Sequence, residues 1–464
     1  MEPTWPARRL AAAIAGRQLA SRELLQTFLD RIERFNPALN AVVTLDAERA
    51  MRAAPAADEA VAQGRALGPL HGLPVTIKDA IEVAGLRSTG GAAELSGHVP
   101  QTDAVAVSRL RAAGAIVFGK TNVPRWSSDI QTYNELFGTT SNPWDPARTP
   151  GGSSGGAAAA VAAGLTSFEL GTDIAGSVRI PAHFCGVFGL KPSFGVIPQR
   201  GYLDHVGGGT TDADINVFGP IARDADDLDL LLGVLAGPEP ERETAWRLEL
   251  PPPRRTTLKS MRIGLWLEDP GCPMDREVLA LLRAAAGRLA DAGARIEEAH
   301  PPVEFSHQVN LFNQLVLAAI SPSLPAEVAE AVGGSHRKWL QADQDRAALR
   351  RAWARWFEDF DLLICPVLGV AAFPHNQQGE ISDRVLDVNG EPAPHTALLG
   401  WTGLIGVAGL PSAVASAGRT AAGLPVGVQL VAPFLRDRDA VRAARMVSEV
   451  LGGYQPPPST GRSR

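Results

Sequence analysis

Residues 150–156 read Pro150-Gly151-Gly152-Ser153-Ser154-Gly155-Gly156, and a small apolar run over 157–164 follows at once. A flexible linker would join two separately folded pieces, but this segment leads directly into a helical alanine pattern. A phosphate-binding loop needs Gly-Lys-Ser or Gly-Lys-Thr after its glycines, and this segment has no lysine. What remains is a tight turn whose glycines permit unusual backbone angles and place two hydroxyl groups at the start of a helix.

A second glycine turn lies a short way on, over 171–182, and carries Ser177. Helix capping by Ser153, Ser154 or Ser177 is the purely structural interpretation of both turns. A serine at a helix start, close to free backbone N–H groups, also has the geometry of a nucleophile beside an oxyanion site. The catalytic interpretation requires a base, which the two turns do not contain.

Lys78 is the candidate base. It ends the apolar strand predicted over 73–78, where partial loss of solvent would lower the pKa of its amine. A surface lysine with only its stem buried is the alternative. His183 lies six residues beyond Ser177 but has no identifiable orienting partner, so a packing role is the better interpretation.

The wider pattern alternates helices and strands, which indicates an α/β sheet. Near the N-terminus, a helix over 21–35 has Ser21 as its expected cap, and Asn36-Pro37 is expected to end it. The further elements expected from hydrophobic spacing are helices over 47–63, 103–113, 275–292 and 436–451, and strands over 114–119, 261–267, 294–298, 362–365 and 426–431.

Composition sets limits on the class of protein. A chain of 464 residues with 45% hydrophobic and 20% charged residues has the makings of a large globular core. The net charge of -6 is spread without a basic stripe, so no nucleic-acid surface is expected. The three cysteines and nine histidines form no metal-ligand spacing, and no apolar run approaches a membrane span. These features predict a cytoplasmic protein without metal.

The segment from about 67 to 227 resembles the amidase signature family. The resemblance is carried by six blocks, which are 72–79 (GLPVTIKD), 119–122 (GKTN), 138–144 (GTTSNPW), 151–156 (GGSSGG), 171–182 (GTDIAGSVRIPA) and 186–192 (GVFGLKP). It implies an α/β/α sandwich with a large central mixed β-sheet. It also implies a single amidase domain over 1–464, in which the proline-rich segment 238–253 crosses the surface.

The resemblance further implies a Ser-cisSer-Lys triad. In this sequence Ser177 would be the nucleophile, Ser153 the bridging serine after a cis peptide bond, and Lys78 the base. The backbone N–H groups of Ile174, Ala175, Gly176 and Ser177 would form the oxyanion hole. Four residues would hold the two turns in place: Ser154, Thr172, Asp173 and Arg179. The sequence departs from the family at Ala175, where glycine is usual, and at Arg125-Trp126, where an acidic residue is common.

The activity implied is hydrolysis of C–N bonds in amides, and also in carbamates (urethanes) and esters, through an acyl-enzyme on Ser177. An apolar substrate pocket is expected from Trp126, Tyr133, Phe137 and Leu203. On this view the substrate is a small molecule and the protein a monomer or homodimer, with no cofactor, nucleic acid or membrane. The alternative is the glutamine-hydrolysing component of a glutamyl-tRNA amidotransferase, which works with partner subunits and tRNA. A silent scaffold on the same fold is a third interpretation, and the intact Lys78, Ser153 and Ser177 argue against it.

Overall fold

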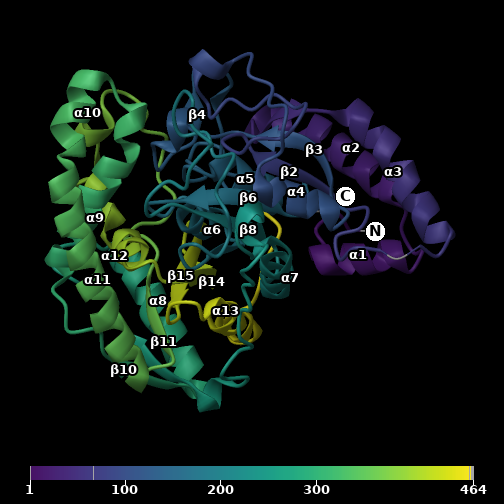
Figure 1. Ribbon diagram of the computed structural model, residues 1–464. Coiled ribbons are helices and arrows are strands. Elements are labelled where there is room, and N and C mark those ends of the chain that lie inside the picture. The colour runs from purple at the N-terminus through teal and green to yellow at the C-terminus, as the bar shows by residue number, and fades with distance from the viewer. Residues whose placement is uncertain (1, 66, 459, 461–464) are drawn as a thin grey trace.

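The computed structural model describes residues 2–65, 67–458 and 460 (Figure 1). Its α-helices are α1 (Ala7–Ala15), α2 (Ser21–Leu39), α3 (Ala47–Ala62), α4 (Val105–Ala112), α5 (Gly155–Ala162), α6 (Arg179–Cys185), α7 (Ala225–Leu235), α8 (Arg276–Asp291), α9 (Phe305–Ile320), α10 (Ala326–Gly333), α11 (His336–Asp359), α12 (Gly400–Ala408) and α13 (Asp437–Leu451). Its strands are β1 (Val42–Leu45), β2 (Pro74–Lys78), β3 (Ile116–Thr121), β4 (Tyr133–Asn134), β5 (Gly138–Thr139), β6 (Glu169–Asp173), β7 (Phe188–Lys191), β8 (Val217–Ala222), β9 (Arg262–Leu265), β10 (Arg295–Glu298), β11 (Leu362–Pro366), β12 (Val385–Val388), β13 (Glu391–Pro394), β14 (Ser412–Arg419) and β15 (Pro425–Val431).

An eight-stranded sheet in the order β10-β9-β11-β15-β14-β7-β8-β6 forms the centre of the molecule. The pairs β10–β9 and β9–β11 are parallel and the remaining pairs are antiparallel. Helices α5 and α6 pack on the sheet as one group, and α7, α8 and α13 pack as another. The expected α/β/α sandwich with a large mixed sheet is therefore confirmed.

The central sheet draws on both halves of the chain. Strands β6 to β8 come before residues 238–253, whereas β9 to β11, β14 and β15 come after them. Most of the residues in 238–253 are exposed, and only a short 3₁₀ turn, Pro240–Arg242, is regular there. The segment thus connects two sets of strands that belong to one sheet.

Two helical groups flank the sheet at opposite ends (Figure 1). Helices α1 to α3 gather beside a second, three-stranded sheet in the order β1-β3-β2, while α9 to α12 pack together at the far side. Strand β2 also packs next to β6, so the end of β2 comes close to the central sheet. Among the described residues, no helix combines the length and the apolar character needed to cross a membrane.

The second helix departs from the sequence expectation at both ends. It continues past Pro37 to Leu39, because the Asn40 N–H still donates to the Asn36 carbonyl in a left-handed cap. At its start, the Ser21 side chain does not cap the helix but donates to the Gly72 carbonyl. The Asp58 carboxylate from α3 accepts the Ser21 N–H at 2.6 Å instead. A tertiary partner far along the chain has replaced the local cap.

Candidate active site

Lys78 is the last residue of β2 and is fully buried. Its Nζ donates to the Ser153 Oγ at 2.7 Å and to the Thr172 Oγ1 at 2.8 Å. Ser153 comes from the glycine turn before α5, and Thr172 lies on β6. The packing of β2 beside β6 therefore brings together three polar side chains that are distant in the sequence.

Burial makes the Lys78 amine an unusually weak base for a lysine. Loss of solvent lowers the pKa of Lys78 from its ordinary value of 10.5 to about 7, against the opposing attraction of Asp173 and Glu169. Burial also raises the pKa of Glu169 to about 7. Near neutral pH this carboxyl group is therefore only partly ionised and attracts the Lys78 ammonium only weakly. A substantial fraction of Lys78 is therefore neutral at pH 7 and able to accept a proton.

The glycine turn around Ser153 is closely packed. The Gly152–Ser153 peptide bond is cis. Ser154 stands at the N-cap position of α5, but its side chain makes no capping hydrogen bond, so the expectation of a serine cap fails here. The Ser154 Oγ instead contacts the Thr172 backbone, 3.3 Å from its oxygen and 3.4 Å from its nitrogen. Ser154 therefore ties the turn to β6.

Replacing Gly152 by alanine should lower the free energy of unfolding by about 1–3 kcal/mol, as overpacking does in other interiors. A Cβ at this position would lie 2.4 Å from the Asp129 carbonyl oxygen and 2.6 Å from the Gln131 nitrogen, so backbone would have to move. Urea denaturation of both proteins measures the change. Gly97→Ala is the matched control, because a Cβ there meets nothing within 4 Å. Equal stability of the two variants would contradict the close packing of this turn.

The second turn is organised by the Asp173 carboxylate. It accepts hydrogen bonds from the Gly176 N–H at 2.8 Å and the Val178 N–H at 3.1 Å, and it pairs with Arg179 at 2.8 and 3.0 Å. Burial alone would raise the pKa of Asp173, but the charge and hydrogen bonds of Arg179 outweigh it and lower that pKa to about 2. Asp173 is thus ionised throughout the range in which proteins are folded, and it holds the turn around Ser177.

One of the four N–H groups expected in the oxyanion hole is already engaged. The Gly176 N–H donates to Asp173, so its assignment to the hole is corrected. The carboxylate accepts it because Asp173 lies at the base of the same turn and is held there by Arg179. The N–H groups of Ile174, Ala175 and Ser177 remain as the proposed donors.

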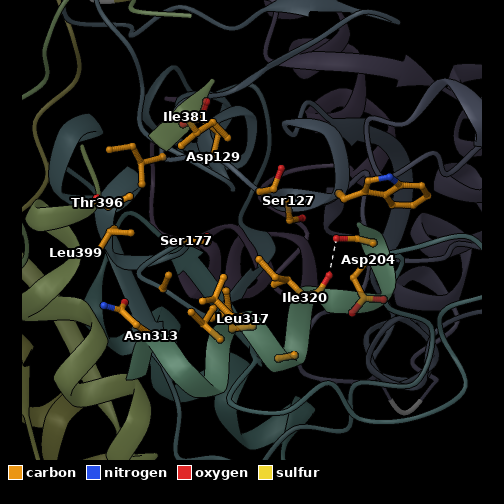
Figure 2. A pocket seen from close by; sticks show the side chains of 18 of the residues that line it. Ser127, Asp129, Ser177, Asp204, Asn313, Leu317, Ile320, Ile381, Thr396 and Leu399 are labelled. Atoms are coloured by element: carbon orange, nitrogen blue, oxygen red, sulfur yellow. Dashed lines mark hydrogen bonds between the residues drawn. The ribbon is translucent and has the colours of Figure 1, made fainter. Parts of the chain in front are cut away.

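Ser177 lies on the wall of a cavity of about 400 Å³. It is 7% exposed, and its carbonyl accepts the Ser154 N–H at 3.1 Å, which links the two glycine turns. Figure 2 shows Ser177 between Ser127 and Asp129 above and Leu317 below. The cavity is lined mainly by apolar side chains, among them Trp126, Ile174, Phe312, Val316, Leu317 and Ile320.

The structure places one of the four predicted pocket residues on the cavity wall. Trp126 lies on the cavity wall and has a left-handed backbone conformation, with φ of 52°. The other three point elsewhere, because aromatic or aliphatic character alone does not reveal which way a side chain faces. The Tyr133 hydroxyl accepts from Arg384 at 2.8 Å, the Phe137 ring lies 5.0 Å from the Arg87 guanidinium, and Leu203 is buried outside the cavity lining.

Sequence reasoning missed the helix that forms the opposite wall. Helix α9 contributes Phe312, Val316, Leu317 and Ile320 to the cavity wall. The sequence signal that could have revealed this helix is its broad run of apolar residues at helical spacing. Sequence reasoning also missed Thr402 and Gln429. Arg179 donates to the Thr402 carbonyl at 3.0 Å and to the Gln429 Oε1 at 2.8 Å, and the Thr402 hydroxyl donates to the Ala175 carbonyl at 2.8 Å. No local motif marks these last two residues.

His183, the histidine nearest to Ser177 in the sequence, has a packing role. His183 is buried, with Nδ1 accepting the Gly427 N–H at 2.7 Å and Nε2 lying 3.0 Å from the Val370 carbonyl oxygen. Burial lowers the pKa of His183 to about 4, although backbone hydrogen bonds with Val370 and Gly427 oppose the shift. Within 2–65, 67–458 and 460, no cluster of three or more histidine, cysteine or acidic side chains could hold a metal ion.

The site combines a mixed α/β sandwich, a buried lysine hydrogen-bonded to Ser153, and a backbone hydrogen bond that ties this turn to the one carrying Ser177. This is the class of C–N hydrolases that the sequence blocks resemble. The family model described as Amidase matches residues 23–332 and 326–441. The chain therefore belongs to the amidase family and is an amidase-family hydrolase acting on C–N bonds.

Individual relatives differ in what they do. The A-type subunit of the glutamyl-tRNA(Gln) amidotransferase of Cyanothece sp. is 30% identical over 475 residues, which cover 93% of this chain and 94% of the relative. The solved structure of a vestigial protein complex, connected with the origins of an s-triazine catabolic enzyme, has a TM-score of 0.84 at 28% identity and covers 97% of this chain and 100% of its own. A bacterial aryl acylamidase has a TM-score of 0.82 at 26% identity, covering 97% and 96%.

The sequence-based expectation about partners is wrong. It held that the protein meets only a small-molecule amide or carbamate, as a monomer or homodimer without nucleic acid. Relatives that align along nearly the whole chain are instead subunits of an enzyme named for a tRNA. The inference failed because the absence of a basic stripe argues only against a broad nucleic-acid-binding surface on this chain. In an assembly of several subunits, another subunit can carry that surface.

Proposed function

We propose that the protein hydrolyses the C–N bond of a carboxamide through an acyl-enzyme on Ser177. The observation that carries this proposal is the 2.7 Å hydrogen bond between the Lys78 Nζ and the Ser153 Oγ, in a fully buried lysine whose pKa is lowered to about 7. Such an amine is neutral often enough to act as a base at physiological pH. The whole chain would act as one amidase unit, because its central sheet uses strands from both sides of 238–253.

In the proposed reaction, neutral Lys78 draws a proton from Ser177 through Ser153. The Ser177 Oγ forms a bond to the carbonyl carbon, and the oxyanion is held by the N–H groups of Ile174, Ala175 and Ser177. The C–N bond then breaks as the proton returns through Ser153 to the leaving nitrogen. Water hydrolyses the resulting ester and restores the Ser177 hydroxyl.

The curated relatives favour glutamine as the amide. The extent of the match to the A-type subunits of glutamyl-tRNA(Gln) amidotransferases supports a role as the glutamine-hydrolysing component of a multi-subunit amidotransferase. Asp204 lies on the cavity wall and would suit the α-ammonium group of free glutamine. In this role, partner subunits and a tRNA acceptor complete the reaction.

The cavity wall favours a second candidate, an uncharged amide. None of the cavity-lining residues in the described part of the chain is a lysine or arginine, and His205 is already 2.7 Å from Asp204. The α-carboxylate of glutamine would thus lack a permanently charged cationic partner there. The apolar lining from α9 would suit an alkyl or aryl group. A carbamate or ester of similar shape would meet the same wall.

One pair of assays tests the proposed reaction and separates the two candidates. Pentanoyl 4-nitroanilide reports hydrolysis by release of 4-nitroaniline, and glutamine reports it by release of ammonia. Turnover of either amide above the level of a Ser177→Ala preparation is the expected result. Glutamine turnover alone selects the amidotransferase role, and anilide turnover alone selects the uncharged amide. If neither amide reacts in wild-type protein while Ser177 resists serine-directed reagents, the proposed reaction is wrong.

A further inference from the structure

His395 is a buried polar side chain that the proposed reaction does not use. It starts the short 3₁₀ helix His395–Leu399, is 2% exposed and contributes to the wall of the cavity that holds Ser177. Neither of its ring nitrogens has a hydrogen-bond partner among the residues that the structure describes. Leaving a buried polar group unpaired is unfavourable, so such a group in a binding cavity points to a ligand that satisfies it.

The backbone around His395 holds the ring in place. The His395 N–H donates to the Arg384 carbonyl at 3.0 Å, and the Phe373 ring packs against the imidazole at 5.3 Å between centroids. In Figure 2 the next residue, Thr396, lies on the same side of the cavity as Asp129 and Ile381, facing Leu317 and Ile320. His395 lines the same cavity as the apolar α9 residues Leu317 and Ile320.

The charged groups near His395 are already paired with each other. Arg384 is 5% exposed and donates to the Asp129 carboxylate at 2.7 Å and to the Tyr133 hydroxyl at 2.8 Å. Burial lowers the pKa of His395, with Asp129 opposing and Arg384 adding to the shift. The ring is therefore neutral at pH 7 and offers one donor and one acceptor without a net charge.

We propose that His395 is a specificity-determining residue that hydrogen-bonds an uncharged polar group of the substrate, a carbonyl or an N–H, in addition to the scissile amide. The preferred substrate is then an amide with a second neutral polar group, such as another amide, in an otherwise apolar body. This inference rests on the proposed acyl-transfer function and takes the second of its two substrate classes. A neutral ring would not compensate a substrate carboxylate.

A matched pair of amides tests the role of His395. N-Acetylglycyl 4-nitroanilide and pentanoyl 4-nitroanilide have acyl chains of similar length, but only the first carries a second amide. Binding is measured by calorimetry in the Ser177→Ala background, so that no turnover is needed. The acetylglycyl compound should bind about tenfold more tightly than the pentanoyl compound, the size expected for one satisfied buried group.

Variants of His395 show whether the ring causes this preference. His395→Leu should bring the ratio of the two dissociation constants to near one, whereas His395→Gln, which keeps a donor and an acceptor, should retain part of it. His395→Ala cannot clash and replaces the leucine variant if that protein does not fold. His307→Phe on the exposed face of α9 is the control and should keep the full ratio.

The outcomes separate this inference from the proposed reaction. A ratio near one in the protein that retains His395, or a ratio unchanged by His395→Leu or His395→Ala, overturns the role of His395 even if wild-type protein turns over both anilides. A preference that depends on His395, in a wild-type protein that hydrolyses neither anilide, keeps the binding role and counts against the proposed hydrolysis.

Discussion

Replacing Ser177 by alanine should lower kcat by at least about 10⁴-fold on any amide that the wild-type protein hydrolyses, as loss of the nucleophile does in other serine hydrolases. The turn that carries Ser177 is held by Asp173 and Arg179, neither of which depends on the Ser177 hydroxyl. The variant should therefore keep the melting temperature of the wild type within a few degrees. Steady-state kinetics and thermal denaturation of the same preparations measure both quantities.

A labelling experiment adds a second readout for Ser177. A fluorophosphonate should add its mass to the peptide that contains Ser177 in wild-type protein and leave the Ser177→Ala variant unlabelled. Ser96→Ala, at an exposed position, is the matched control and should keep both activity and labelling. Undiminished turnover by Ser177→Ala would remove this serine from the reaction.

Replacing Lys78 by methionine should likewise lower kcat by at least about 10⁴-fold, because groups that act as one unit in catalysis lose their effect together. For the same reason, the Lys78→Met/Ser177→Ala double variant should be no slower than the slower single variant. In wild-type protein, kcat/KM should fall about tenfold per pH unit below pH 7, because protonated Lys78 cannot accept the Ser177 proton. The rate should level off above that pH. A pH profile that is flat from 5 to 9 would contradict Lys78 as the base.

The same substitution has a predicted effect on stability, and its sign follows from the pKa of Lys78. Above pH 10.5, Lys78 is neutral in both the folded and the unfolded chain, so its lowered pKa does not affect the free energy of unfolding. Between pH 10.5 and 7 only the unfolded chain takes up the proton, so the folded state becomes progressively less stable. Below pH 7 both states are protonated and the loss of stability stays constant. Lys78→Met should thus be more stable than the wild type at pH 7, with the difference shrinking as the pH approaches 10.5. Urea denaturation at several pH values measures this. A variant less stable at pH 7 would mean that the Ser153 and Thr172 hydrogen bonds outweigh the burial of the amine.

Local pattern was sufficient for some of the elements, missed others such as α9, and did not indicate the partners of those it found. Strand β2 could be predicted because Val75 and Ile77 alternate with small or polar residues in a short β-branched run. The end of α2 could not, because Asn36 and Pro37 favour a turn locally while hydrogen bonds to Asn36 continue the helix. The cap of that helix comes from Asp58, and nothing near Ser21 in the sequence indicates it.

The candidate site shows the same division. Lys78, Ser153 and Ser177 stand in motifs with a recognisable order, so they could be selected before the structure was known. Thr402 and Gln429 could not, because a carbonyl oxygen and a side-chain amide that support Arg179 leave no pattern of their own. The cavity wall was equally hidden, since Phe312 and His395 come to line one cavity only when α9 and the segment after β13 fold against the core.

The order of strands in the central sheet has a consequence for how the protein is made. Among the described residues, the group β7-β8-β6 and the group β10-β9-β11 are joined through β14 and β15, which follow all the other strands of this sheet in the sequence. A nascent chain that has not reached Gln429 has two unconnected sheet fragments and an Arg179 without one of its supports. The turn that carries Ser177 therefore has all of its supports only after Gln429 has been synthesised.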